Sequence, residues 1–195
     1  MGFSGHLVFA RSEQSLPSAP VFDGIGRERK DAVHEWWPRP GGWQTVLVDH
    51  GLWEEDHLQA LVEWTGAPVC VAEVSDSDLA LVTGLGTGGR RWQAWLNLDR
   101  AAVLLADEPE DLDDQSLWED SPEFQEAVAR KRAELDAEVP SDAEGALAWA
   151  AAAGVAVPGR RSRIEQVLRS RETFAEDLFG ELLDELGFPE PVEPE

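Results

Sequence analysis

The chain has 195 residues, and its 39 acidic and 16 basic side chains give a formal net charge of −23 at pH 7. This charge argues against nucleic acid as a partner, because contacts to phosphates need basic side chains that displace counterions. Apolar residues make up 43% of the chain, yet no apolar run approaches the roughly 20 residues that span a membrane. We therefore expect a soluble protein that binds neither nucleic acid nor membrane.

The first hundred residues predict a β-sheet with one helix, and the first predicted strand is at 6–10. Apolar and β-branched runs predict strands at 6–10, 44–48, 69–74, 79–82 and 92–98. Residues 54–65 begin with acidic side chains, carry an apolar stripe and end before Gly66, which predicts a helix. The resulting β-α-β unit permits a parallel crossover, so we expect a mixed sheet.

The second half of the chain predicts helices. Ser121 can cap a helix that has Pro122 at its first position, and Pro140 is expected to end it. Capping-box patterns at 141–144 and 173–176 predict the starts of two more helices.

These elements predict an α+β fold, with an N-terminal mixed β-sheet carrying one helix and a C-terminal helical segment. Residues 107–123, which contain nine acids and no base, mark the boundary between the two parts. The expected units are a Trp-rich sheet domain at 1–106, an acidic linker at 107–120, a helical region packed on or beside the sheet at 121–188, and a frayed tail at 189–195.

The N-terminus and the single cysteine predict a cytoplasmic protein. Residues 1–6 show neither the regions of a signal peptide nor a myristoylation pattern, because His6 stands where Ser or Thr is needed. Cys70 lies in an apolar run and is expected to be a buried, inert thiol.

The glycines at positions 84, 86 and 89 match the spacing of a dinucleotide-binding loop. The residues that follow alternate like a strand, so no helix N-terminus is expected to face the loop. We predict a hairpin connection at 84–89 and no bound cofactor.

Metal and nucleophile motifs are incomplete. His34, His50 and His57 have poor spacing for zinc, and solvated or capping histidines are the expected state. Counted from Asp111, the acidic run lacks the EF-hand glycine and glutamate. The chain has no G-x-S-x-G elbow, and an acid/base carboxylate pair cannot be chosen among 39 acids. We therefore expect no metal and lean against an enzyme.

Arginines form the chain's one concentrated positive cluster, which we expect to pair with the acidic helices rather than with an outside phosphate. They are Arg160, Arg161, Arg163, Arg169 and Arg171.

Two features predict contacts with a partner. Most of the nine tryptophans are expected in the core, but Trp36 and Trp37 stand beside Pro38 in a turn-rich stretch where exposure is expected. Residues 101–195 hold 25 acidic and 8 basic residues, a field that speeds encounter with cationic macromolecules. The linker fits either a solvated spacer or a surface for a basic protein. Its predicted partner contacts are Glu110, Asp111, Asp113 and Asp114.

Segments at 74–82, 88–97, 146–150 and 173–176 resemble a pattern in small acidic uncharacterised actinobacterial proteins. The resemblance implies a bacterial cytoplasmic setting and transfers no activity.

Two functions follow as hypotheses from the sequence. The first is a non-enzymatic binding module, of inhibitor or immunity type, for a basic protein. The alternative is a small hydrolase or ligand-binding enzyme with a cleft lined by carboxylates and Trp.

Overall fold

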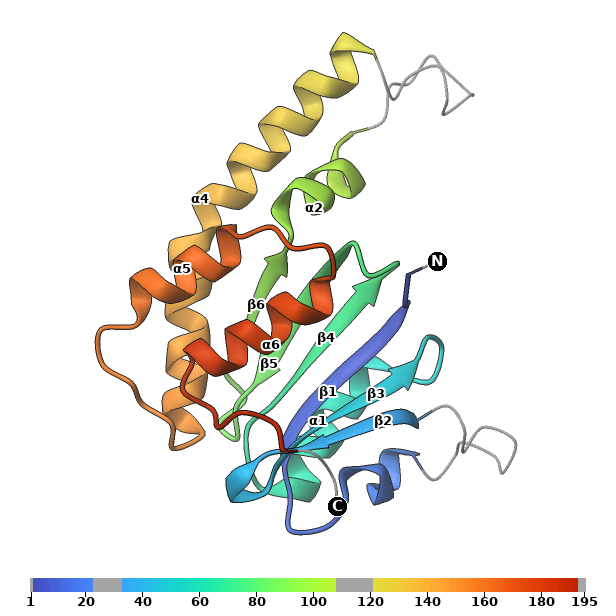
Figure 1. The fold of residues 1–195 in the computed structure, drawn as a ribbon, viewed down its shortest axis with the longest axis vertical. Coiled ribbons are helices and arrows are strands. Elements are labelled where there is room, and N and C mark those ends of the chain that lie inside the picture. Colours follow the sequence, from blue (N-terminus) through green and yellow to red (C-terminus); the bar gives the residue numbers. More distant parts are fainter. Residues whose placement is uncertain (1, 23–32, 108–120, 193–195) are drawn as a thin grey trace.

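The computed structural model describes residues 2–22, 33–107 and 121–192, and at 33–36 it describes the backbone alone. It confirms the α+β class, because strands fill the first part of the chain and helices the last (Figure 1). The strands are β1 (Gly5–Arg11), β2 (Val33–Pro38), β3 (Trp43–Asp49), β4 (Val69–Ser75), β5 (Leu79–Leu85) and β6 (Arg91–Leu96). Short 3-10 turns lie at Leu16–Ser18, Pro20–Phe22 and Pro40–Gly42.

The six strands form one sheet in the order β2-β3-β1-β4-β5-β6. Every neighbouring pair is antiparallel, so the sheet is not mixed as the sequence suggested. The β3-α1-β4 unit does have two strands that run in the same direction, but β1 lies between them and pairs with both. A strand from the start of the chain therefore occupies the position that a parallel neighbour would have taken.

Helix α1 (Glu55–Thr65) confirms the predicted helix and its ends. Glu55 and Asp56 lie in its first turn, where negative charge interacts favourably with the helix dipole. Gly66 ends the helix in the left-handed conformation, with φ of 64°. The buried side chains of α1 are Leu58, Leu61 and Val62, which belong to the predicted stripe.

After the sheet, the described residues form helices α2 (Leu98–Leu105), α4 (Pro122–Ala152), α5 (Arg161–Arg169) and α6 (Ala175–Glu185). Figure 1 shows α4, α5 and α6 gathered over one face of the sheet, with α1 on the opposite face. Part of α4 extends beyond the sheet alongside α2 (Figure 1).

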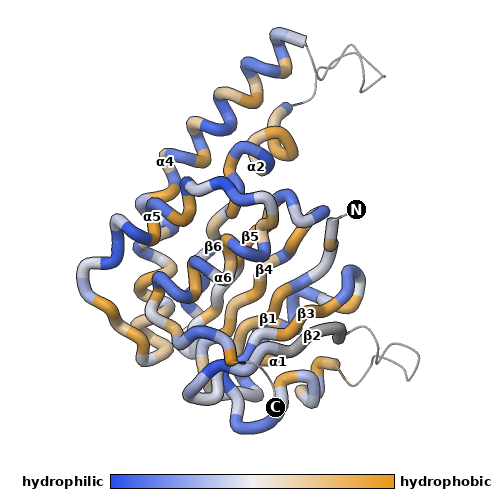
Figure 2. The backbone as a smooth tube through the Cα atoms, viewed as in Figure 1, coloured by the Kyte–Doolittle hydropathy of each residue, from blue (hydrophilic) through white to orange (hydrophobic). Residues whose placement is uncertain are grey.

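Alternation along the strands divides the core between the two faces. On β1, Leu7 and Phe9 belong to a cluster with α4, α5 and α6, whereas Val8 and Ala10 belong to a cluster with α1. The first cluster joins side chains from both parts of the predicted division at 106, so sheet and helices share a core. Figure 2 shows the corresponding colouring, with largely apolar strands and alternating polar and apolar stretches along α4.

Aromatic rings fill the centre of the larger cluster. Phe9 stacks on Trp43 at a centroid distance of 5.0 Å, and Phe188 meets both rings edge-on. Trp149 of α4 packs 5.4 Å from Phe188 and 6.0 Å from Trp92. Burial of these tryptophans confirms that part of the Trp content is core.

Helix α4 corrects the prediction of a helix end at Pro140. The helix is continuous through this proline, and the 141–144 pattern lies inside it rather than at a start. Proline removes the hydrogen bond to the carbonyl four residues earlier, which belongs to Asp136. Arg169 of α5 reaches that region, with Nε 2.9 Å from Asp136 Oδ1 and Nη2 3.5 Å from the Asp136 carbonyl oxygen. A tertiary contact therefore compensates for the missing bond.

Other elements also differ from expectation. Helix α2 lies in the part at 1–106 where only one helix was expected, and β2 was not predicted. Helix α5 lies within the predicted helical region at 121–188, although its bounds were not predicted. The cap of α6 is Phe174 and makes no side-chain capping bond, so 173–176 is not a capping box. Glu176 instead accepts a 2.6 Å hydrogen bond from Ser77 Oγ. The start of the tail is not frayed, because the Val192 N–H donates to the Pro38 carbonyl at 2.8 Å.

Candidate functional site

A groove of about 500 Å³ lies between α6 and strands β1, β2 and β3, and we call it the α6 groove. Its apolar lining comes from both parts of the chain: Leu7, Trp37 and Leu47 from the strands, and Phe179 and Leu183 from α6. These side chains reach the groove because odd positions of β1 and β3 face the helices, while Phe179 and Leu183 are four residues apart on α6. The groove thus has an apolar floor.

Carboxylates form the rim of the α6 groove. Asp177, Glu181 and Asp184 are exposed and follow each other at spacings of four and three, so they lie along one side of α6. Glu176 completes the rim and is half-buried. Like charges at this spacing repel one another, by about 0.2–0.5 kcal/mol per pair in isolated helices. A bound cation would relieve that repulsion.

Among the described residues that line the groove, Arg39 is the one basic side chain. It is buried, with 4% of its side chain exposed, and its Nη1 donates to Asp184 Oδ1 at 2.8 Å and to the Pro189 carbonyl at 2.9 Å. Its guanidinium also lies 5.8 Å from the centroid of Phe9. Because Arg39 is already paired, three carboxylates of the rim remain without a cation from the groove itself.

Several buried polar atoms in the groove lining lack a hydrogen-bond partner among the described residues: Arg39 Nε, Thr45 Oγ1 and Glu176 Oε2. An unsatisfied buried polar atom costs about 1–3 kcal/mol. Gly180, in the middle of α6, leaves room in the lining of the groove, because a Cβ built there meets no heavy atom within 4 Å. The groove therefore combines space with unsatisfied hydrogen-bonding groups.

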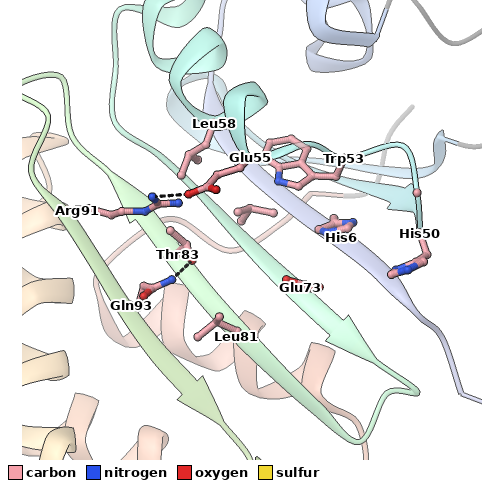
Figure 3. A pocket seen from close by; sticks show the side chains of 12 residues that line it. His6, His50, Trp53, Glu55, Leu58, Glu73, Leu81, Thr83, Arg91 and Gln93 are labelled. Carbon is pink, nitrogen blue, oxygen red and sulfur yellow. Dashed lines mark hydrogen bonds and ion pairs between the residues drawn. The ribbon is translucent and has the colours of Figure 1, made fainter.

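A second hollow, of about 380 Å³, lies on the opposite face of the sheet beside α1 (Figure 3). We call it the sheet hollow. Figure 3 shows Trp53 and Leu58 on the α1 side, and Leu81, Thr83 and Gln93 on the strands across from them.

His6 occupies one end of the sheet hollow. Its ring stacks on His50 at a centroid distance of 6.2 Å and on Trp53 at 5.8 Å. Burial, with a smaller contribution from His50, lowers the pKa of His6 from 6.5 to about 4. The ring is therefore neutral near pH 7, and its Nδ1 has no hydrogen-bond partner among the described residues.

The structure brings only part of the predicted contact surface into a candidate site. Trp37 is half-buried in edge strand β2 and lines the α6 groove, rather than standing exposed in a turn. Trp36 is in the same strand, and its side chain is outside the described part. Glu110, Asp111, Asp113 and Asp114 also lie outside the described residues.

Sequence reasoning missed the rim carboxylates and Arg39. The spacing of Asp177, Glu181 and Asp184 was visible as an acidic stripe on the last helix. Nothing in the sequence, however, placed Trp37 and Arg39 opposite that stripe, because the contact joins residues about 145 positions apart.

The remaining motifs have structural roles. Residues 86–90 form the hairpin turn between β5 and β6, where the Gly86 N–H donates to the Arg90 carbonyl at 2.9 Å, whereas Gly84, predicted to be part of the connection, is a paired residue of β5. A Cβ at Gly84 would lie 2.0 Å from Trp92 Nε1, so this glycine makes room for a core indole. The Cys70 thiol is buried as predicted, which raises its pKa.

The histidine and arginine predictions can also be located. The Glu54 N–H donates to His57 Nδ1 at 3.2 Å, so His57 is a capping histidine, and His50 is exposed. Arg160 pairs with Glu185 of α6 and Arg169 with Asp136 of α4, as predicted, whereas Arg161 pairs with Glu165 of its own helix. Across the described ranges, no group of three or more potential ligands could hold a metal ion.

The fold and the two hollows define an α+β protein with a six-stranded antiparallel sheet, helices on both faces and an acid-rimmed groove. Comparisons with protein-family models, curated proteins and solved structures find no match. In the part of the chain that the structure describes, no helix has the length and apolar character to cross a membrane.

Proposed function

We propose that this protein is a non-enzymatic binding module, of inhibitor or immunity type, that binds a basic protein and takes a Lys or Arg side chain of it into the α6 groove. The observation that carries the proposal is the rim of four carboxylates, three of them exposed, around an apolar floor whose one basic side chain is already paired.

The groove suits a long cationic side chain better than a small ion. Lys and Arg have apolar stems with a charge at the end, and such stems lie favourably along apolar surfaces. Leu47, Phe179 and Leu183 offer that surface, and Trp37 offers an aromatic face for a cation. The charged end would lie among Asp177, Glu181 and Asp184.

The net charge of −23 supports the same partner class. A strongly acidic protein repels acidic macromolecules and speeds encounter with basic ones, over a range of about 8 Å at physiological salt. The acidic residues at 110–114 are proposed to contribute to this steering. The single buried thiol, Cys70, fits a cytoplasmic setting for the encounter.

The groove also favours the alternative in one respect. It lies between the sheet and the last helix and contains carboxylates and Trp37, as a ligand-binding cleft would. In that case the occupant would be a small organic cation rather than a side chain of a protein. Affinity capture distinguishes the two functions, because a protein-binding module retains a macromolecule and a ligand-binding enzyme does not.

Paired affinity capture from native bacterial lysate tests the proposal. One bait is the unmodified protein, and the other carries Gly180→Leu, which fills the groove from a position with free space around it. The matched control is Gly88→Leu in the exposed hairpin turn, where a Cβ also meets no heavy atom within 4 Å. We expect a basic protein to be retained by the unmodified protein and by the Gly88→Leu control, and lost with Gly180→Leu.

Three outcomes would contradict the proposal. A retained protein with an acidic surface would contradict the charge argument, and retention unchanged by Gly180→Leu would exclude the groove. If no protein is retained but a small organic cation raises the melting temperature of the unmodified protein alone, the ligand-binding alternative replaces the proposal.

A further inference from the structure

The sheet hollow lies on the half of the sheet face that α1 leaves uncovered. Helix α1 packs against β1, β4 and β5, while the outward positions of β5 and β6 include Leu81, Gln93 and Trp95. Leu81 and Trp95 are directly opposite each other and are only half-buried. This face is separate from the α6 groove, because successive residues of a strand point to opposite faces.

The charges in the hollow nearly balance. Arg91 Nη1 donates to Glu55 Oε1 at 2.9 Å, so the one Arg or Lys among the described lining residues is already paired (Figure 3). His6 is neutral near pH 7. Glu73 is the remaining charged group, and it lies at the rim, exposed to solvent. Among the described lining residues, an anion would find no unpaired Arg or Lys side chain, and a cation would find a single solvated carboxylate.

Hydrogen-bonding capacity in the hollow is mixed and incompletely used. The Gln93 amide donates to Thr83 Oγ1 at 3.0 Å, which leaves the amide oxygen as an acceptor. Glu73 can accept, and Arg91 has further N–H groups that can donate. His6 is 5% exposed and has one ring nitrogen without a partner among the described residues. A ligand that both donates and accepts would match this set.

The apolar part of the hollow is a Trp wall above aliphatic side chains. Trp53 is half-buried at the edge of the hollow, and Leu58, Val71 and Leu81 lie below the polar rim. The ligand should therefore have an apolar face as well as hydroxyl-type groups. The volume of about 380 Å³ is at the small end of the range for ligand pockets, roughly 300–1,000 Å³.

We propose that the sheet hollow binds an uncharged polyhydroxylated molecule of mono- or disaccharide size. The C–H face of such a molecule would pack on Trp53 and Leu81, and its hydroxyls would both donate and accept at Glu73, Gln93 and Arg91. This site is independent of the proposed function, because its residues and its face of the sheet differ from those of the α6 groove.

The test is a titration of the full chain followed by NMR, with the Trp53 indole and the Gln93 side-chain amide as reporters. The probes are the common neutral hexoses and their disaccharides, together with glucuronate, glucosamine and a nucleoside as chemical contrasts. We expect at least one neutral sugar to give saturable shifts at both reporters, and its charged derivatives to bind more weakly. Combined Glu73→Ala and Gln93→Ala substitution should weaken binding at least tenfold.

Two further variants separate loss of the site from loss of the fold. Trp53→Phe keeps an aromatic ring in the packing and should weaken binding severalfold. Trp64→Phe changes a half-buried Trp that does not line the hollow and should leave binding unchanged. The proposal is overturned by an absence of saturable shifts with every neutral sugar, by tighter binding of a charged derivative or the nucleoside, or by equal binding in the Glu73/Gln93 variant.

Discussion

Arg39 links the sheet to the end of the chain. Its guanidinium is buried, whereas the carboxylate of Asp184 is 42% exposed and the Pro189 residue is exposed. The two partners therefore depend on the bond to different degrees. Water can replace Arg39 at the exposed Asp184 carboxylate, whereas a guanidinium with 4% of its side chain exposed would lose its counterion and keep only the Pro189 carbonyl.

This asymmetry predicts unequal effects of two substitutions. Asp184→Ala leaves a buried charge without its counterion and should lower the free energy of unfolding by roughly 3 kcal/mol. Arg39→Met keeps the apolar stem and should cost about 1 kcal/mol or less. Urea denaturation of both variants measures the difference. Equal losses of unfolding free energy in the two variants would show that Arg39 does not depend on the ion pair more than Asp184 does.

Gly180 is a second residue whose role can be measured. It lies inside α6, where glycine costs about 0.8–1.0 kcal/mol relative to alanine, and a Cβ there meets no heavy atom within 4 Å. Gly180→Ala should therefore raise the free energy of unfolding by up to about 1 kcal/mol. Thermal or urea unfolding of the variant measures this change. A lower free energy of unfolding would mean that a side chain at position 180 has no free space.

At the scale of elements, α4 shows why local patterns failed. Pro140 and the 141–144 capping pattern are strong signals for a helix break, and both were overruled by packing of Leu135, Val139 and Ala143 against the core. The sheet strands and α1 were predictable, because their periodicity and end signals agree with their burial. Strand β2 could not be predicted from the sequence, because it is an edge strand with a register irregularity between Val33 and Glu35.

The contact between Arg169 and Asp136 predicts a coupling with Pro140. Pro140→Ala restores an N–H that can reach the Asp136 carbonyl and should stabilise the protein by up to about 3 kcal/mol. Arg169→Ala should then cost about 0.5–1.5 kcal/mol less in the Pro140→Ala background than in the unmodified chain. A double-mutant cycle of unfolding free energies tests this. If the effects of the two substitutions on the free energy of unfolding are additive, Arg169 does not compensate for the missing hydrogen bond at the Asp136 carbonyl.

Asp142 of α4 predicts a dependence on pH. Burial, and next the charge of Glu138, raise the pKa of Asp142 from 3.8 to about 6. The folded protein therefore takes up this proton at a higher pH than the unfolded chain, so this group destabilises the fold above pH 6 and the penalty disappears as pH falls toward 3.8. Asp142→Asn should raise the melting temperature at pH 7.5, and the gain should vanish at pH 4. A gain that is independent of pH would exclude titration as its cause.

At the scale of the whole molecule, the two faces of the sheet have different characters. One face is covered by α4, α5 and α6 and ends in the acid-rimmed groove, and the other is half covered by α1 and carries the sheet hollow. The sequence predicted the acidity and the class of fold, because both follow from composition and local pattern. It did not predict either hollow, since each one joins strands and helices whose neighbours depend on strand order.

The charge prediction for the linker stays open to a kinetic test. Neutralising Glu110, Asp111, Asp113 and Asp114 together should slow association with a basic partner and flatten its dependence on salt, with dissociation changed less. By contrast, Trp37→Ala should speed dissociation and cost roughly 2 kcal/mol or more if the indole is an anchor.

An NMR titration with short capped peptides measures whether the α6 groove binds a cationic side chain. We predict that an Arg- or Lys-containing peptide shifts the resonances of Trp37, Leu47 and Gly180 saturably, and that Gly180→Leu abolishes these shifts. A Glu-containing peptide of the same length should have no effect. Shifts that are spread over the acidic surface and persist in Gly180→Leu, or equal shifts with the Glu peptide, would contradict the claim.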